Sequence, residues 1–120
     1  MSYDVSFKAK IEGKDVWVPI GCCEANITSN VRKIIMESTG LPWKNGENNG
    51  LCMDIMPCIA KGLDEFKRFP EKYKPLEASN GWGTVKGTIR FFEEILNDWE
   101  EFVNCTFWQD IADVATFWIE

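Results

Sequence analysis

Between Tyr3 and Ile20 the sequence reads YDVSFKAKIEGKDVWVPI, and apolar residues occupy every second position in its first half. A period of two is typical of a strand with one buried face. Gly13 and Lys14 then supply a two-residue turn, in which glycine readily adopts a positive φ. These residues predict a β-hairpin near the start of the chain.

The turn and the alternation independently predict one register for this hairpin. Apolar residues of the two strands face each other as Ile11 with Val16, Ala9 with Val18, and Phe7 with Ile20. These six side chains share one face, and Trp17 lies on the opposite face, across from Lys10. Pro19 has no backbone N–H to donate, which favours a position for the second strand at a sheet edge.

Apolar residues at helical spacing predict a first helix from about Ser29 to Thr39, with an apolar stripe at Ile27, Val31, Ile34 and Ile35. Gly40 stands where a C-terminal glycine cap belongs. The segment from Trp43 to Gly50 is rich in Asn and Gly, so we expect an exposed loop there.

A second apolar stripe predicts a helix between Leu51 and Phe66, interrupted by Pro57. Either this helix kinks at the proline, or it begins near Asp54 and has the proline in its first turn. Pro70 is expected to end the helix, and residues 71–83 are expected to form a connector with a single helical turn.

A third helix is expected from about Val85 to Asn104, with Thr84 as its N-terminal cap. Its apolar face is broad, which is typical of a helix that lies across a sheet. Thr106 and Gln109 have the spacing of a capping box and predict a further short helix.

The final residues, Val114 to Glu120, predict a third strand, in which Ala115, Phe117 and Ile119 face inward and Thr116 and Trp118 outward. An isolated hairpin is marginally stable, so this strand is expected to dock beside the first one. The 120 residues then form a single α+β domain, in which a small antiparallel sheet carries three to four helices on one face.

Charge and composition exclude several classes of function. The chain has 13 Lys and Arg against 19 Asp and Glu, which argues against a basic nucleic-acid-binding surface. It has no His, and so lacks the commonest general base and metal ligand. No apolar run is long enough to span a bilayer, and the first residues do not resemble a secretory signal. We therefore expect a cytoplasmic protein with no cofactor and no membrane contact.

The odd number of cysteines predicts free, mostly buried thiols at Cys22, Cys23, Cys52, Cys58 and Cys105. Their spacing does not match a zinc site. Cys22 and Cys23 lie in a loop-like setting, but without His to activate a thiol, packing at a strand end is the favoured reading. Gly81 to Thr84 precedes a helix and is interpreted as a turn and N-cap rather than as a phosphate-binding loop.

A run of acidic residues favours a binding surface. Between Phe91 and Glu120 the chain has no base, and its candidate contact residues are Glu93, Glu94, Asp98, Glu101, Asp110 and Asp113. Acids in the C-terminal half of a helix oppose its macrodipole, so helix stability does not select them. Two readings remain open: the acids keep a small protein in solution, or they dock onto a basic partner.

Tryptophan is the second feature that favours a binding surface. Trp99 and Trp108 are assigned to the core, Trp17 and Trp118 to the sheet face away from the helices, and Trp43 and Trp82 to Asn- and Gly-rich loops. Exposed tryptophans anchor interfaces and ligand pockets, and Trp17, Trp118, Trp43 and Trp82 are therefore candidate contact residues. The competing reading places Trp17 and Trp118 over the stems of Lys8 and Lys10, and folds Trp43 back onto the helices.

Three segments, residues 38–45, 80–84 and 115–120, give the chain a likeness to a group of known proteins. They read STGLPWKN, NGWGT and ATFWIE, and with them the chain resembles small uncharacterised proteins of bacteriophages and integrated mobile elements of Firmicutes. The resemblance spans most of the chain and implies a host-directed accessory protein, a class in which small acidic inhibitors are frequent. It assigns no catalytic or binding residue.

Our leading hypothesis is a non-enzymatic protein-binding module that inhibits a host nucleic-acid-handling or defence protein. The acidic segment from Glu93 to Asp113 would meet a basic surface of that protein. The first alternative is a small-ligand binding or sequestering protein that stacks a ring on Trp17, Trp118 or Trp82. The second alternative is a cysteine-dependent enzyme. A homo-oligomer is compatible with each of these hypotheses.

Overall fold

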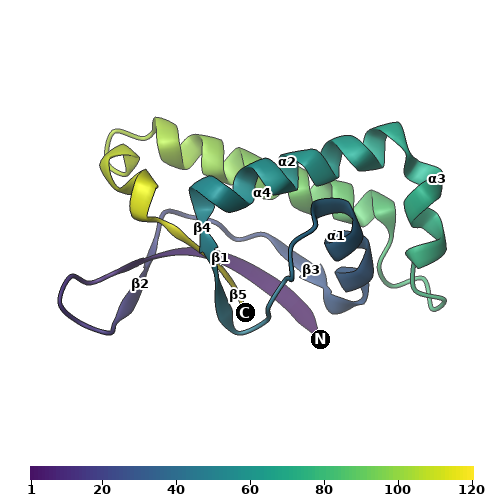
Figure 1. The fold of residues 1–120 in the computed structure, drawn as a ribbon, viewed down its shortest axis with the longest axis horizontal. Helices are drawn as coiled ribbons and strands as arrows, with labels where there is room; N and C mark the ends of the chain where they lie inside the picture. The colour runs from purple at the N-terminus through teal and green to yellow at the C-terminus, as the bar shows by residue number, and fades with distance from the viewer.

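Five strands form one antiparallel sheet, and the helices pack on one of its faces (Figure 1). The structure, a computed structural model, describes residues 1–120. The strands are β1 (Ser2–Lys10), β2 (Trp17–Ile20), β3 (Asn26–Thr28), β4 (Glu47–Leu51) and β5 (Thr116–Ile119). Their order in the sheet is β2-β1-β5-β4, and β3 pairs with β1 beside β2. The α+β fold predicted from the sequence is confirmed.

The helical elements cover residues 29–114, apart from β4 and the connecting loops. The α-helices are α1 (Arg32–Thr39), α2 (Cys52–Arg68), α3 (Pro70–Tyr73) and α4 (Val85–Asn104). The 3-10 helices are η1 (Ser29–Val31), η2 (Lys74–Leu76) and η3 (Gln109–Val114). None of these helices combines the length and the apolar character that crossing a bilayer requires.

The β1–β2 hairpin has the predicted register, with Phe7 opposite Ile20, Ala9 opposite Val18 and Lys10 opposite Trp17. The predicted turn was one residue out of place. The amide of Lys14 donates to the carbonyl oxygen of Ile11 at 3.1 Å, so the β-turn is centred on Glu12 and Gly13. Gly13 has φ +78°, which explains why glycine stands at that position.

The free edge of β2 confirms the prediction made from Pro19. The amide of Ile11 donates to the carbonyl of Val16 at 2.9 Å, which makes this a hydrogen-bonded pair. Such pairs alternate along an antiparallel ladder, so Pro19, opposite Lys8, occupies a non-hydrogen-bonded pair. Its nitrogen therefore faces the outer edge, where a missing N–H removes no ladder bond.

The C-terminal strand docks beside β1, as predicted, with Val5 opposite Ile119 and Phe7 opposite Phe117. Its three inward side chains, Ala115, Phe117 and Ile119, are fully buried. Thr116 faces outward with Trp118, as predicted, but it is buried beneath the Trp118 indole, which donates to its hydroxyl. Its hydroxyl donates to the carbonyl oxygen of Lys8 at 2.6 Å, which satisfies the polar group without water.

Two strands were missed by the sequence analysis. The expected loop at residues 43–50 contains β4, which pairs with β5 and has a register irregularity between Asn48 and Leu51. The side chain of Asn49 accepts from the amide of Lys44 at 2.7 Å and donates to its carbonyl oxygen at 2.8 Å. Ile27, assigned to the first helical stripe, lies in β3 opposite Tyr3.

The helix predictions hold, with corrections at their ends. The first helix is split into η1 and α1, and Gly40 caps α1 in the left-handed conformation with φ +75°. Helix α2 begins at Cys52 and runs through Pro57, so a start near Asp54 was wrong. Pro57 and Met53 are both exposed, so water can reach the Met53 carbonyl oxygen that the proline leaves without an amide donor.

Helix α4 has the predicted bounds, and the amide of Gly87 donates to the Thr84 hydroxyl at 2.9 Å, which confirms the cap. The capping box at Thr106 and Gln109 was wrong. The short helix that follows is η3, and its N-cap residue, Trp108, makes no capping hydrogen bond through its side chain. This helix is held by packing against α2 and α4 instead.

A core of 23 buried hydrophobic residues fills the space between the sheet and the helices. Aromatic rings dominate it around α4. The ring of Phe7 on β1 contacts Trp99 and Phe102 on α4 at centroid distances of 5.6 and 5.8 Å, in edge-to-face geometry. The ring of Phe102 stacks with the ring of Trp99 and with the ring of Trp108, so the core continues to the C-terminal end of α4.

Candidate partner-binding surface

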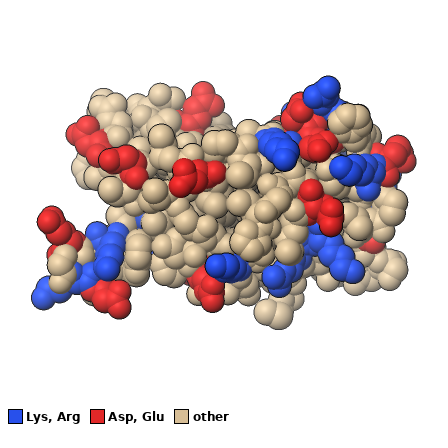
Figure 2. Space-filling model, in the orientation of Figure 1, with Lys and Arg blue, Asp and Glu red and all other residues tan.

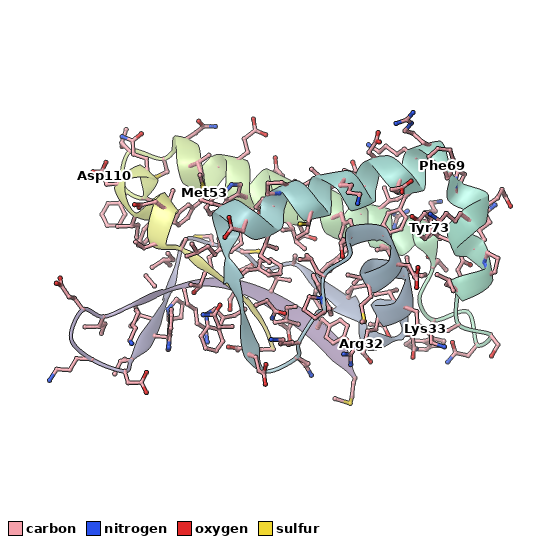
Figure 3. The ribbon with its side chains drawn as sticks, viewed as in Figure 1. Arg32, Lys33, Met53, Phe69, Tyr73 and Asp110 are labelled. Carbon is pink, nitrogen blue, oxygen red and sulfur yellow. The ribbon has the colours of Figure 1, made fainter.

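The acidic residues singled out in the sequence gather at one end of the molecule. Glu94, Asp98 and Glu101 recur at spacings of four and three, which places them on one side of α4. Glu93 is exposed on α4, and Asp110 and Asp113 are exposed on η3. Figure 2 shows carboxylates without Lys or Arg over this end, at the upper left. In Figure 3, Asp110 points away from η3, whereas Arg32 and Lys33 lie at the far end, on α1.

These carboxylates have no cationic partners. The structure contains four ion pairs, which join Lys8 to Glu120, Lys10 to Asp15, Arg68 to Asp64 and Lys74 to Glu71. None of them includes an acid of α4 or η3. The negative charge of this end is therefore not neutralised within the chain.

Burial raises the pKa of Asp98 above its usual value, and the neighbouring carboxylates of Glu101 and Glu24 add to the effect. Hydrogen bonds from the Cys23 thiol and the Glu24 amide partly offset it. Glu94 is also close enough to raise the pKa of the Cys23 thiol. Four carboxylates, those of Glu24, Glu94, Asp98 and Glu101, thus share one region beside the end of β2.

A hollow of about 170 Å³ lies in this region, and its lining residues are Gly21, Cys22, Asp98, Glu101, Phe102, Cys105 and Trp108. We call it the acidic hollow. Gly21 has φ +69° and follows β2 directly, while the other walls come from α4 and the loop after it. Sequence reasoning missed this hollow because it joins segments about eighty residues apart in the chain.

The apolar face of the hairpin is covered along only part of its length. Phe7 and Ile20 are buried as expected, but Ile11, Val16 and Val18 are exposed. Figure 1 shows the reason, since the hairpin extends past the ends of α2 and α4. We call these three side chains the hairpin overhang. They share the face predicted from the alternation, but no helix lies over them.

Trp17 and Trp118 cover the outer face of the sheet, and their ring centroids are 5.4 Å apart. The ammonium group of Lys8 lies 4.5 Å from the centroid of the Trp118 ring and pairs with the carboxylate of Glu120. The indole N–H of Trp118 donates to the Thr116 hydroxyl at 2.9 Å. Both indoles are half-buried in this cluster, which agrees with the prediction that they cover lysine side chains.

The remaining two candidate tryptophans lie elsewhere. Trp43 is only 1% exposed and packs against Tyr3, Phe91 and Phe117, so it belongs to the core and not to the contact residues, which confirms the competing prediction that it folds back onto the helices. Trp82 is 68% exposed but precedes the N-terminal end of α4. At about 1.5 Å per residue along that helix, it is about 20 Å or more from Asp98 and Glu101. The structure therefore does not join Trp82 to the acidic surface.

All five cysteines are free, but only Cys52 is buried, so the prediction of mostly buried thiols was wrong. Burial, with smaller contributions from nearby Asp98 and Glu94, raises the pKa of Cys23 to about 12. Burial likewise raises the pKa of Cys52. No three His, Cys, Asp or Glu side chains are placed to hold a metal ion together. Gly81 and Gly83 have φ of +77° and +113° ahead of the Thr84 cap, in keeping with a turn and N-cap.

No protein-family model, curated protein or solved structure matches this chain.

Proposed function

We propose that this protein is a non-enzymatic binding module whose acidic end contacts a basic surface of another protein. The observation that carries the proposal is the set of unpaired carboxylates on α4 and η3. An uncompensated acidic surface attracts a basic partner over long range and speeds association at low salt.

The energetics of α4 support the same proposal. Glu101 lies in the last turn, where the negative end of the helix dipole destabilises a carboxylate by a few tenths of a kcal/mol, and Asp98 and Glu100 lie in the turn before it. Asp98 carries a further cost, because burial disfavours its charged form. The fold tolerates charges that weaken it, which is what a surface selected for binding would require.

The resemblance to mobile-element proteins extends the proposal to the kind of partner. We assign as partner a host nucleic-acid-handling or defence protein, since such proteins carry basic surfaces for phosphate backbones. An acidic module that covers this surface would compete with the nucleic acid and so inhibit the host protein.

The test is affinity capture from a Firmicutes host lysate at low salt. The native protein is compared with Glu94→Gln/Asp98→Asn/Glu101→Gln, which neutralises the proposed contact residues. The matched control, Glu37→Gln/Asp64→Asn/Glu71→Gln, removes the same charge from the other end, where the exposed ion pairs contribute little. We expect the first variant to lose a basic protein that the control retains, with binding that weakens as salt increases. Equal capture by both variants would contradict the proposal.

One observation favours a second candidate function, the binding of a small ligand. The exposed Trp82 borders a hollow of about 420 Å³ whose other lining residues are Met1, Ser2, Asn26, Thr28 and Asn30. An aromatic face beside amide and hydroxyl groups suits a neutral ring compound. Trp82 fluorescence and thermal shift against panels of nucleosides and sugars test this candidate, and responses absent in Trp82→Ala would favour it.

A further inference from the structure

We infer that the hairpin overhang and the acidic hollow together form a docking site for an amphipathic helix of a partner, with an apolar stripe flanked by Lys and Arg. This inference rests on the proposed function and specifies the partner's structure and the surface that receives it. The occupant would extend the helical layer of the fold over the uncovered part of the sheet.

The layer of helices does not cover the whole inner face of the hairpin. Along the inner face of the hairpin, Phe7 contacts α4 and Phe7 and Ile20 are buried, whereas Val18 and, beyond it, the facing pair Ile11 and Val16 are exposed. The apolar face of a sheet is buried against a second layer of structure, and a helix can supply that layer. An apolar stripe on an incoming helix would bury these three side chains in the same way as α4 buries Phe7.

The hairpin overhang leads to the acidic hollow through the end of β2. Gly21 directly follows Ile20 at the end of β2 and lines the acidic hollow. The ring of Phe102 packs directly against Gly21 and also lines the hollow, and it stacks with Trp99 and Trp108. The apolar side chains of the overhang are thus continued by buried Ile20 to the hollow, which Phe102, Trp108 and the carboxylates of Asp98 and Glu101 line. A Lys or Arg stem fits such a lining, with its charge beside the carboxylates.

The edge of β2 disfavours an added strand. The outward-facing positions of β2 include Pro19, which has no N–H to donate to a neighbouring strand. A partner that extended the sheet at this edge would lose a ladder bond in the middle of β2. Docking on the face of the hairpin avoids this cost, because it requires side-chain contacts and no backbone ladder.

The net charge of the site favours a basic occupant. At the hairpin tip Lys10 pairs with Asp15, and Glu12 and Lys14 are opposite in sign, so the tip contributes no net charge. The net charge of the site comes from α4, η3 and Glu24, and it is negative. A second copy of this chain would bring the same carboxylates together, which is unfavourable. The complementary occupant is therefore a basic one.

The probe is a synthetic amphipathic helix composed of Leu and Lys, labelled for fluorescence anisotropy and mixed with the full chain. Two control peptides are a scrambled version, which has no apolar face, and a Leu and Glu version of opposite charge. The variant Val16→Thr/Val18→Thr keeps β-branched residues in the strand, so the hairpin is preserved while its face becomes polar. The control variant Met36→Gln changes a residue on α1 with the same exposed fraction as Val18, 36%.

We expect the Leu and Lys helix to bind, and its Kd to rise about tenfold in Val16→Thr/Val18→Thr but not in Met36→Gln. Amide shift changes in the native protein should centre on residues 11–22. Equal binding of the scrambled peptide, or an unchanged Kd in the hairpin variant, would overturn the inference. A native dimer that the hairpin variant abolishes would also overturn it, because the occupant would then be a second copy.

The same experiment separates this inference from the proposed function. If Glu94→Gln/Asp98→Asn/Glu101→Gln weakens peptide binding while Val16→Thr/Val18→Thr does not, the acidic contact stands and the hairpin docking site is wrong. If neither variant changes the Kd, both the inference and the proposed function are wrong. Amide spectra of each variant establish that it is folded before its Kd is compared.

Discussion

Gly21 meets Phe102 at a distance that excludes any side chain, since a Cβ at position 21 would lie 2.6 Å from Cδ2 of the ring. Gly21 also has φ +69°, a conformation that disfavours residues with a Cβ. This contact joins the end of the hairpin to α4 and sets one wall of the acidic hollow. Steric overlap and backbone conformation therefore both disfavour a side chain at position 21.

Gly21→Ala is expected to lower the free energy of unfolding by about 2–4 kcal/mol, the sum of left-handed strain and overlap with the ring. Gly13→Ala is the matched control, because Gly13 has φ +78° but no atom near the position of a Cβ. It should lose only about 1–2 kcal/mol. Urea denaturation measures both, and equal losses would show that the ring of Phe102 moves aside.

Trp43→Ala is expected to cost about 3–5 kcal/mol, because it removes a buried indole that contacts three aromatic rings. Trp43→Phe should cost much less, since the buried Nε1 of Trp43 has no hydrogen-bond partner. The exposed Trp82 serves as the control, and Trp82→Ala should change stability by less than about 0.5 kcal/mol. Denaturant curves followed by circular dichroism compare the three, and similar losses at positions 43 and 82 would contradict the assigned burial.

The raised pKa of Asp98 predicts a definite pH dependence of stability. The folded protein retains the Asp98 proton to higher pH than the unfolded chain, whose carboxyl has the ordinary pKa of 3.8. The unfolding free energy should therefore fall as the pH rises from about 4 through the raised value. Asp98→Asn should flatten this part of the curve and raise the melting temperature at neutral pH. Glu93→Gln, a change on the exposed side of α4, is the control, and an equal effect there would contradict the assignment to Asp98.

Lys8 and Trp118 should be energetically coupled on the outer sheet face. The ammonium lies over the indole, and the lysine side chain is only 18% exposed. A double-mutant cycle with Lys8→Met and Trp118→Leu should give a coupling of about 0.5–1 kcal/mol. The cycle of Lys10 with Trp118 is the control and should show no coupling, because Lys10 lies at the hairpin end. Additive effects in both cycles would show that the cation–π contact contributes no measurable stability.

Thiol alkylation tests the assignment of the cysteines. Cys22 is exposed, whereas Cys23 is partly buried with a pKa of about 12, so roughly 10⁻⁴ of it is thiolate at about pH 8. We expect iodoacetamide to modify Cys22 first and Cys23 and Cys52 only after unfolding, as followed by peptide mass spectrometry. Fast modification of Cys23 in the folded protein would instead favour the cysteine-dependent enzyme.

The hairpin and α4 were predictable because their local signals agree. In the hairpin, the alternation and the turn length select one register, and the structure keeps that register although the turn is centred on Glu12 and Gly13. In α4, a capping threonine and a broad apolar face mark the same helix. Where two independent signals point to the same structure, tertiary context has little left to change.

The rest depended on contacts between distant segments. Asn48 and Asn49 have low strand propensity, and only pairing with β5 makes β4 a strand. Trp43 is surrounded by loop residues in the sequence, but contacts from β1, α4 and β5 bury it. Val16 and Val18 are exposed because the hairpin extends past the end of α4. No local sequence pattern encodes this difference in length. The acidic charge was visible in the sequence, whereas the hollow beside it was not.

The position of β5 between β1 and β4 has a consequence for the order in which the protein folds. As the ribosome produces these 120 residues, β1 and β4 emerge early, but the strand that joins them is made last. Until then both keep unpaired edges and the aromatic core lacks Phe117, so a nascent chain is exposed to aggregation. Deletion of residues 116–120 should therefore give an insoluble product rather than a weakened native domain.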